Sequence, residues 1–174
     1  ELVPAALRWR WTLAGELPVR DSAHILTRIA KRGSNGVLWK APDVPEIAEA
    51  ILHLAAARIP VVTLVTDVPH SQRVAYVGID NRAAGETAAY LIGQWMDKTP
   101  AQILVTLSSS RFRGEEEREI GFRRVLRETY PHLEAVEISE GFGRDRTTGL
   151  QVREALARNQ RICAVYSIGG GHSA

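Results

Sequence analysis

Short apolar runs and longer stretches with helical spacing of apolar residues alternate from one end of the chain to the other. The short runs are rich in β-branched residues and predict strands at residues 7–13, 36–39, 60–65, 74–79, 103–107, 133–138 and 164–168. The longer stretches predict one helix after Asp21-Ser22, one after Asp43, and three at residues 83–96, 114–128 and 147–158. This regular alternation is typical of the α/β class with doubly wound parallel sheets.

Two of the predicted helices have a start signal and an apolar face. Asp21 and Ser22 are the expected N-cap of the first helix, and Asp43 that of the second, with Pro45 in its first turn. The faces expected to pack on a core are Ile25, Leu26, Ile29 and Ala30 in the first helix, and Ile47, Ile51, Leu54 and Ala55 in the second. The strand at residues 60–65 is largely apolar and β-branched, which predicts a parallel sheet covered on both faces.

The pattern restarts after residue 97, where Lys98-Thr99-Pro100 marks the expected boundary between two subdomains. We therefore expect an N-terminal α/β subdomain over residues 1–97 and a C-terminal one over residues 98–174. The chain opens just before a strand and closes on a glycine-rich turn with no following helix. A βα unit that stops at its turn leaves sheet area uncovered, so we expect this chain to be part of a longer protein.

Composition narrows the classes of function. The formal net charge is +2, and basic residues lie beside acidic ones, so the chain itself does not predict a nucleic-acid surface. No run approaches the roughly 18 apolar residues that span a bilayer, and the start lacks a signal peptide, so we expect a cytoplasmic protein without a membrane partner. The single Cys163 excludes an internal disulfide, and its apolar surroundings predict a buried, inert thiol.

Asp80 and Asn81 end the strand at residues 74–79 and begin the next helix. Ligands of open α/β sheets bind at the carboxyl ends of strands, so this pair is a candidate for hydrogen bonds to ligand hydroxyls. The alternative is an N-cap that satisfies the first N–H groups of the helix.

Arg118 is the second candidate, because it shares a helix face with the apolar Phe122 four residues later. An inward arginine near a helix N-terminus opposes the helix dipole, which suggests a ligand such as vicinal hydroxyls or a carboxylate. The alternative is an intrahelical ion pair with Glu115 or Glu119. Glu115 to Glu117 are themselves expected to be solvated.

Further candidates lie in the strand-to-helix turns. Ser110 and Arg113 could line a cleft or simply form a polar loop, and Phe142 could stack on a sugar face or cover the core. The closing segment with Gly170 and His172 matches only a relaxed dinucleotide fingerprint. The histidines show no metal-ligand spacing, and no nucleophile is paired with a base, so we expect no cofactor and no enzyme.

Four segments together resemble the effector-sensing core of LacI-family transcriptional regulators. They occur in family order and are Gly36–Trp39, Ile59–Leu64, Val77–Asn81 with Gly85, and Arg118–Phe122. The resemblance implies two Rossmann-like subdomains with the type I periplasmic-binding-protein fold. It also implies that the first strand and helix of the core, and its last third, are missing here.

The resemblance places family ligand residues on particular positions. Asp80 matches an acidic residue that contacts the effector in many members, and Arg118 matches an arginine that holds effector hydroxyls. Phe142 lies near an aromatic residue that walls the cleft. Gly170 and His172 fall where many relatives have an Asn-Asp pair.

The implied function is sensing of a sugar-like effector by a homodimeric regulator, with operator DNA bound through a head domain absent from this chain. The alternative is a periplasmic sugar-binding protein that serves an ABC transporter and shares the same fold. A nucleotide-dependent enzyme, resting on the terminal glycines, is a third reading.

Overall fold

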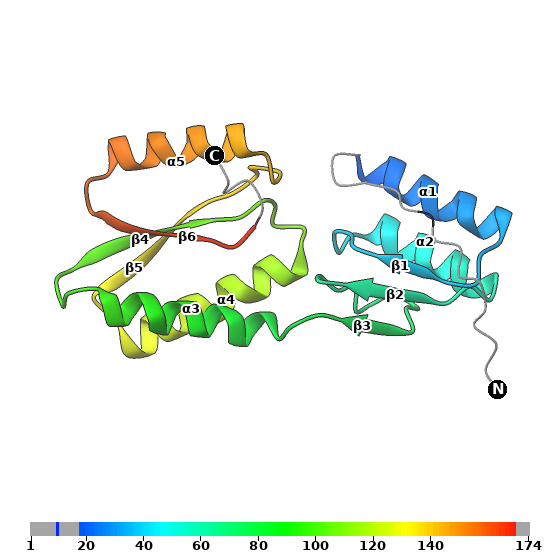
Figure 1. Ribbon diagram of the computed structural model, residues 1–174, viewed down its shortest axis with the longest axis horizontal. Helices are drawn as coiled ribbons and strands as arrows, with labels where there is room; N and C mark the ends of the chain where they lie inside the picture. Colours follow the sequence, from blue (N-terminus) through cyan, green and yellow to red (C-terminus); the bar gives the residue numbers. More distant parts are fainter. Residues whose placement is uncertain (1–9, 11–17, 170–174) are drawn as a thin grey trace.

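Two parallel sheets of three strands each form the frame of the computed structural model, which describes residue 10 and residues 18–169 (Figure 1). The predicted strand at residues 7–13 and the candidates Gly170 and His172 lie outside the described residues. The first sheet has the order β1-β2-β3, and the second has the order β5-β4-β6. All four strand pairings are parallel.

Helices and strands alternate as the apolar pattern predicts, and the bounds agree within a few residues. The first lobe contains α1 (Val19–Arg32), β1 (Val37–Trp39), α2 (Pro45–Ala56), β2 (Val61–Leu64) and β3 (Ala75–Val77). The second lobe contains α3 (Asn81–Trp95), β4 (Ala101–Thr106), α4 (Arg113–Thr129), β5 (Leu133–Ile138), α5 (Asp145–Arg158) and β6 (Ile162–Ser167). None of the described helices is long and apolar enough to cross a membrane.

Each lobe has its own apolar core. The first core joins α1 and α2 to β1 and β2 through fully buried residues such as Leu26, Ile51 and Val61. The second core joins α3 and α4 to the second sheet and includes Ala89 and Phe122. Because α3 packs in the second core, the packing divides the lobes before α3, not at residue 97 as the sequence pattern suggests.

The two sheets differ in how they are covered. In the second lobe α5 covers one face, and α3 with α4 covers the other, as expected for a doubly wound sheet (Figure 1). In the first lobe α1 and α2 lie on the same face of the sheet. On its other face Leu38 is 50% and Val77 58% exposed, so the predicted cover on both faces is not present among the described residues.

Three local expectations are wrong. Helix α2 begins after Val44 without a side-chain cap, because Asp43 lies one residue too early and turns toward the second lobe. Cys163 is exposed rather than buried, since it lies on the edge strand β6 of the described sheet. Helix α1 begins at Val19 after Pro18, so Asp21 and Ser22 lie inside the helix and are not its N-cap, contrary to the expectation from the sequence.

Helices α3 and α4 cross at very short range through two glycines. A Cβ atom added to Gly85 would lie 1.9 Å from the carbonyl oxygen of Arg118, and one added to Gly121 would lie 2.2 Å from that of Arg82. Since real Cβ atoms do not approach oxygen so closely, only glycine permits this crossing. The crossing sets the position of Arg118 relative to the start of α3.

Candidate functional site

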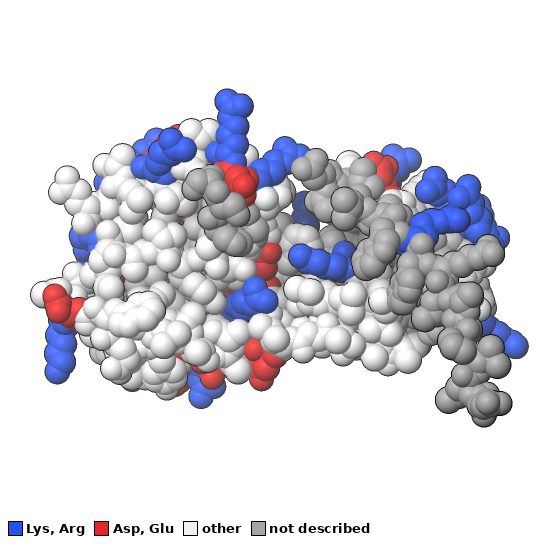
Figure 2. All heavy atoms as spheres, viewed as in Figure 1, with Lys and Arg blue, Asp and Glu red and all other residues white. Residues whose placement is uncertain are grey.

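The carboxyl ends of the strands of both sheets meet at the junction between the lobes. After β1, the amide of Asp43 donates to the carbonyl of Arg111, which follows β4, at 2.8 Å. After β2, Thr66 Oγ1 accepts a hydrogen bond from the amide of Gly114 in α4 at 3.1 Å. Figure 2 shows the surface hollowed at this junction. In α/β proteins such a convergence of strand ends is the usual place for a ligand.

Asp80 and Asn81 lie at this junction with different roles. Asp80 is exposed and caps α3, because its carboxylate accepts a hydrogen bond from the amide of Ala83 at 2.9 Å. Asn81 is 3% exposed, and its Nδ2 donates to Tyr76 Oη at 3.1 Å. Its Oδ1 is buried with no hydrogen-bond partner among the described residues. The N-cap alternative therefore holds for Asp80, and a ligand role of the pair stays a prediction.

Arg118 points away from its own helix toward the end of β6. Its Nη1 donates to the carbonyl of Ile168 at 3.1 Å, and its Nε is buried without a partner among the described residues. Burial raises the pKa of the nearby Tyr166, and the charge of Arg118 opposes that rise. No described ion pair joins Arg118 to Glu115 or Glu119, so the proposed intrahelical alternative is not observed.

The serine-rich turn after β4 is held by two carboxylates. Glu115 accepts hydrogen bonds from the amide of Ser108, at 2.7 Å, and from its hydroxyl. The expectation that Glu115 is solvated is therefore wrong, because the turn folds back over the first turn of α4. Glu140, after β5, accepts from the Ser109 hydroxyl at 3.2 Å and from the Ser110 amide at 3.3 Å. These bonds hold the turn in one conformation, so that its polar groups form a wall on one side of the junction.

Arg113 and Phe142 lie at the rim of this wall. Arg113 forms an ion pair with Glu117 at 3.2 Å and lies 3.9 Å from the carboxylate of Asp43 in the other lobe. The ring of Phe142 is not buried in the core, because its side chain is 58% exposed. Its backbone has a φ of 53° and its amide donates to the carbonyl of Ser108 at 2.8 Å. The exposed ring is free to stack on a ligand face.

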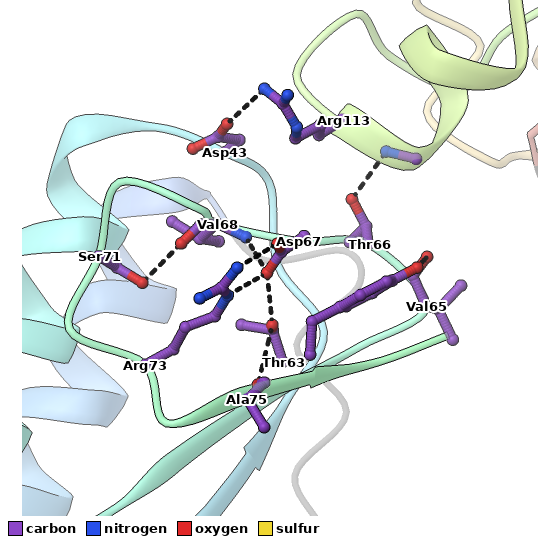
Figure 3. Close-up of polar contacts among 12 residues, drawn as sticks. Asp43, Thr63, Val65, Thr66, Asp67, Val68, Ser71, Arg73, Ala75 and Arg113 are labelled. Atoms are coloured by element: carbon purple, nitrogen blue, oxygen red, sulfur yellow. Dashed lines mark hydrogen bonds and ion pairs between the residues drawn. The ribbon is translucent and has the colours of Figure 1, made fainter. Parts of the chain in front are cut away.

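Asp67 organises the loop that follows β2, as Figure 3 shows. Its carboxylate accepts hydrogen bonds from Thr63 Oγ1 at 2.7 Å, from the amide of Val68 at 2.8 Å and from Nη2 of Arg73 at 2.6 Å. Burial alone would raise the pKa of Asp67, but the bonds from Arg73, Thr63 and Val68 outweigh burial and lower it below 3.8.

This lowered pKa predicts an acid-dependent loss of stability. The Asp67 contribution is complete above the unfolded-state pKa, near 3.8, and is lost as the pH falls from there through the folded-state pKa. We expect the stability gap between the wild type and Asp67→Asn to shrink as the pH falls from about 5 to about 3. Urea unfolding across this range measures the gap. The exposed Asp97→Asn serves as the control, and a gap that stays constant with pH would contradict the assignment.

Outside the junction, neither the charged surface nor the described pockets indicate a second site between the lobes. Figure 2 shows basic side chains gathered over α1, which carries Arg20, Arg28, Lys31 and Arg32, and both signs of charge near the junction. Two open pockets lie away from the junction, one of about 280 Å³ beside α4 and β5 and one of about 460 Å³ along α1. Their described lining residues come from a single lobe each. The described residues contain no cluster of three or more side chains suited to a metal ion.

Four residues at the junction were not predicted from the sequence. They are Asp43, Thr66, Glu115 and Glu140. Asp43, Thr66 and Glu140 each follow a strand, so the strand-end rule applied to Asp80 also points to them. Glu115 had no such signal, because its role depends on how the turn after β4 folds back.

Comparisons with known proteins agree with this architecture. A model of the family described as periplasmic binding protein domain matches residues 18–174. No curated protein has a significant match to the chain. Among solved structures the chain is similar to GanP, a glucose-galactose binding protein from Geobacillus stearothermophilus, with 25% identity and a TM-score of 0.77. That likeness covers 86% of this chain and 53% of that protein.

Two further structures are solute-binding proteins of ABC transporters. One, from Agrobacterium vitis with bound D-fucose, has 24% identity, a TM-score of 0.77 and coverage of 88% of this chain and 53% of its own. The other, from Burkholderia graminis with D-arabinose, has 19% identity, a TM-score of 0.78 and coverage of 84% and 50%. The chain thus spans about half the length of these structures. The likenesses confirm the predicted fold class.

Proposed function

Because the chain belongs to the periplasmic binding protein domain family, we propose that its two lobes bind a sugar or sugar derivative between them. The observation that carries this proposal is the meeting of the strand ends of both sheets at a junction where Arg118 Nε and Asn81 Oδ1 are buried without described partners. A buried donor and a buried acceptor gain most from a ligand that both donates and accepts hydrogen bonds. Sugar hydroxyls do both.

The roles follow from the chemistry of each side chain. The fork of Arg118 donates to neighbouring hydroxyls, and the carboxylate of Asp80 accepts from one. Ser110, Asn81 and the rim residue Arg113 supply further polar contacts. Phe142 stacks on the apolar face of the sugar ring. The similar structures from Geobacillus, Agrobacterium and Burkholderia, which are described with glucose-galactose, D-fucose and D-arabinose, support a sugar as the ligand class.

Within this class we place the chain in the effector-sensing part of a LacI-type regulator. The support is the sequence resemblance in the segments that contain Asp80 and Arg118. In this proposal the regulator is a cytoplasmic homodimer that binds operator DNA through a separate head domain. Sugar binding shifts the arrangement of the lobes and changes operator affinity by a coupling of about 1–3 kcal/mol.

A second candidate is a sugar-binding protein that serves an ABC transporter. The solved structures described above favour it, since two of the three are transporter proteins. The two candidates predict the same sugar site at the junction between the lobes. They differ in partner, because only the regulator binds DNA.

Calorimetric titration of the complete protein with D-glucose, D-galactose, D-fucose and D-arabinose tests the common part of the proposal. We expect saturable binding of at least one sugar, whereas NAD, the ligand expected of a dinucleotide enzyme, should give none. Binding of NAD without any sugar would overturn the proposal. Gel retardation of the protein's own promoter DNA, with and without the bound sugar, then separates regulator from transport protein.

Asp80 needs a test that separates its cap from a ligand role. Asp80→Ala removes both and should cost about 1 kcal/mol of stability, whereas Asp80→Ser keeps an oxygen that can cap α3. If the carboxylate binds the sugar, both variants should lose about 10- to 100-fold in affinity. Thermal unfolding and calorimetry on the same samples measure the two effects. Wild-type affinity in Asp80→Ser would leave Asp80 with a capping role alone.

A further inference from the structure

Strand β2 ends in a turn that a valine adopts only under strain. Val65 has a φ of 66°, in the left-handed region where β-branched residues are rare. The amide of Thr66 donates to the carbonyl of Leu64 at 2.7 Å, so the hydrogen bond closes a three-residue turn. The side chain of Val65 is 49% exposed, so its burial does not explain the conformation.

Hydrogen bonds from the connection between the lobes hold this turn. The amide of Val65 donates to the carbonyl of Val77 at 3.0 Å. The carbonyl of Val65 accepts from Tyr76 Oη at 3.1 Å and from Asn81 Nδ2 at 3.5 Å. Tyr76 belongs to β3 and Asn81 begins α3, so the strained turn is tied to the segment that joins the lobes. Strain of this kind persists only where surrounding contacts enforce it, and it is concentrated at functional and switching sites.

The turn delivers Thr66 to the start of α4 in the other lobe, as Figure 3 shows. Thr66 is 3% exposed, and its hydroxyl accepts the hydrogen bond of the Gly114 amide. The first amides of a helix have no partner within the helix, and the N-cap residue of α4, Phe112, provides no side-chain cap. Thr66 therefore caps α4 from across the junction, in the way that an N-cap threonine does within a helix.

Gly114 makes this approach possible. A Cβ atom at this position would lie 3.1 Å from the Val65 carbonyl oxygen and 3.1 Å from Asn81 Nδ2, closer than most real contacts of such atoms. The same helix carries Arg118 one turn later, so the cap also fixes the arginine expected to bind the sugar.

We propose that the Val65–Thr66 turn is a strained catch between the lobes, which regulates ligand affinity by favouring the arrangement in which Thr66 caps α4. Its last step, the effect on affinity, rests on the proposed function. Parting of the lobes breaks the bond from Gly114 to Thr66, but it also breaks the bond from Asn81 of α3 to the Val65 carbonyl, which lets Val65 relax. The cap and the strain therefore oppose each other, which keeps the two arrangements close in free energy and open to control by a ligand.

Three variants separate the two parts of the catch, which are the cap that Thr66 provides and the backbone strain at Val65. Thr66→Val keeps the shape and removes the acceptor, and Thr66→Ser keeps the acceptor as the matched control. Val65→Asn retains the turn but eases the left-handed backbone, which asparagine tolerates. Spin labels at Leu52→Cys in α2 and Leu156→Cys in α5, which are 51% and 41% exposed, report the lobe separation in a Cys163→Ser background. Amide exchange at Gly114 reports the cap directly.

We expect Thr66→Val to raise Gly114 exchange and to lower sugar affinity, each about fivefold, the effect of one lost capping bond. The label distances should shift toward separated lobes in Thr66→Val and toward joined lobes in Val65→Asn, and Thr66→Ser should match the wild type. Unchanged Gly114 exchange in Thr66→Val, or lobe shifts of the same sign in both variants, would overturn the catch. If the complete protein binds no sugar, the proposed function fails, and the exchange and distance data still decide whether the catch exists.

Discussion

Replacing Gly85 with alanine is expected to lower the free energy of unfolding by about 2–3 kcal/mol, although alanine is the better helix former. The added Cβ atom would lie 1.9 Å from the carbonyl oxygen of Arg118, which is backbone and cannot rotate away. Helices α3 and α4 must then move apart, which opens the second core around Phe122. In an exposed helix position the same change would stabilise by about 1 kcal/mol, so the sign of the effect is diagnostic.

Chemical denaturation of the wild type and of Gly85→Ala measures this difference. Gly36→Ala is the matched control, because its Cβ atom would meet Pro60 only at an ordinary contact distance of 3.5 Å. A Gly85→Ala protein as stable as the wild type would mean that the two helices do not cross at the distance seen here. The same variant should also weaken sugar binding, since moving α4 displaces Arg118.

Replacing Arg118 with alanine is expected to weaken sugar binding about 100-fold, the scale of losing charged hydrogen bonds in a partly buried site. Arg118→Lys should recover only part of the loss, because an ammonium group lacks the planar fork of a guanidinium. The only bond of the side chain to the described residues is that to the Ile168 carbonyl, so the fold should lose about 1 kcal/mol at most.

Arg127→Ala is the control for this experiment, since Arg127 is an exposed arginine near the other end of the same helix. Calorimetry with the sugar found in the titration panel compares the three variants with the wild type. Equal affinity in Arg118→Ala and Arg127→Ala would show that Arg118 does not bind the sugar. Another donor at the junction between the lobes would then have to bind it.

The alternation of elements could be predicted from the sequence alone because it depends on local spacing. Apolar residues at helical and strand periods indicated every described helix and strand, and strand β5 has the predicted bounds. The same local logic placed Asp80 at a strand end and Arg118 on an inward helix face. Both residues do lie at the junction of the lobes, although the Asp80 carboxylate accepts a hydrogen bond that caps α3.

Errors arose where a residue's partner is distant in sequence. Asp43 looks like an N-cap, but it contacts a segment some 70 residues away, as the distance to Arg113 shows. Glu115 looks solvated because its helix turn is acidic, yet the fold of the preceding loop brings Ser108 against it. The exposure of Cys163 depends on β6 being an edge of the described sheet, and no local pattern distinguishes an edge strand from a central one.

By itself, then, the sequence determined the order of helices and strands and the α/β class, since both follow from short-range periodicity. Only the tertiary structure decided that α3 joins the second lobe, that Gly85 and Gly121 set the distance between α3 and α4, and that Thr66 caps a helix of the opposite lobe. The reason is physical: these contacts join residues far apart in the chain, and a side chain's partner there depends on how packed elements are oriented, not on its neighbours in sequence.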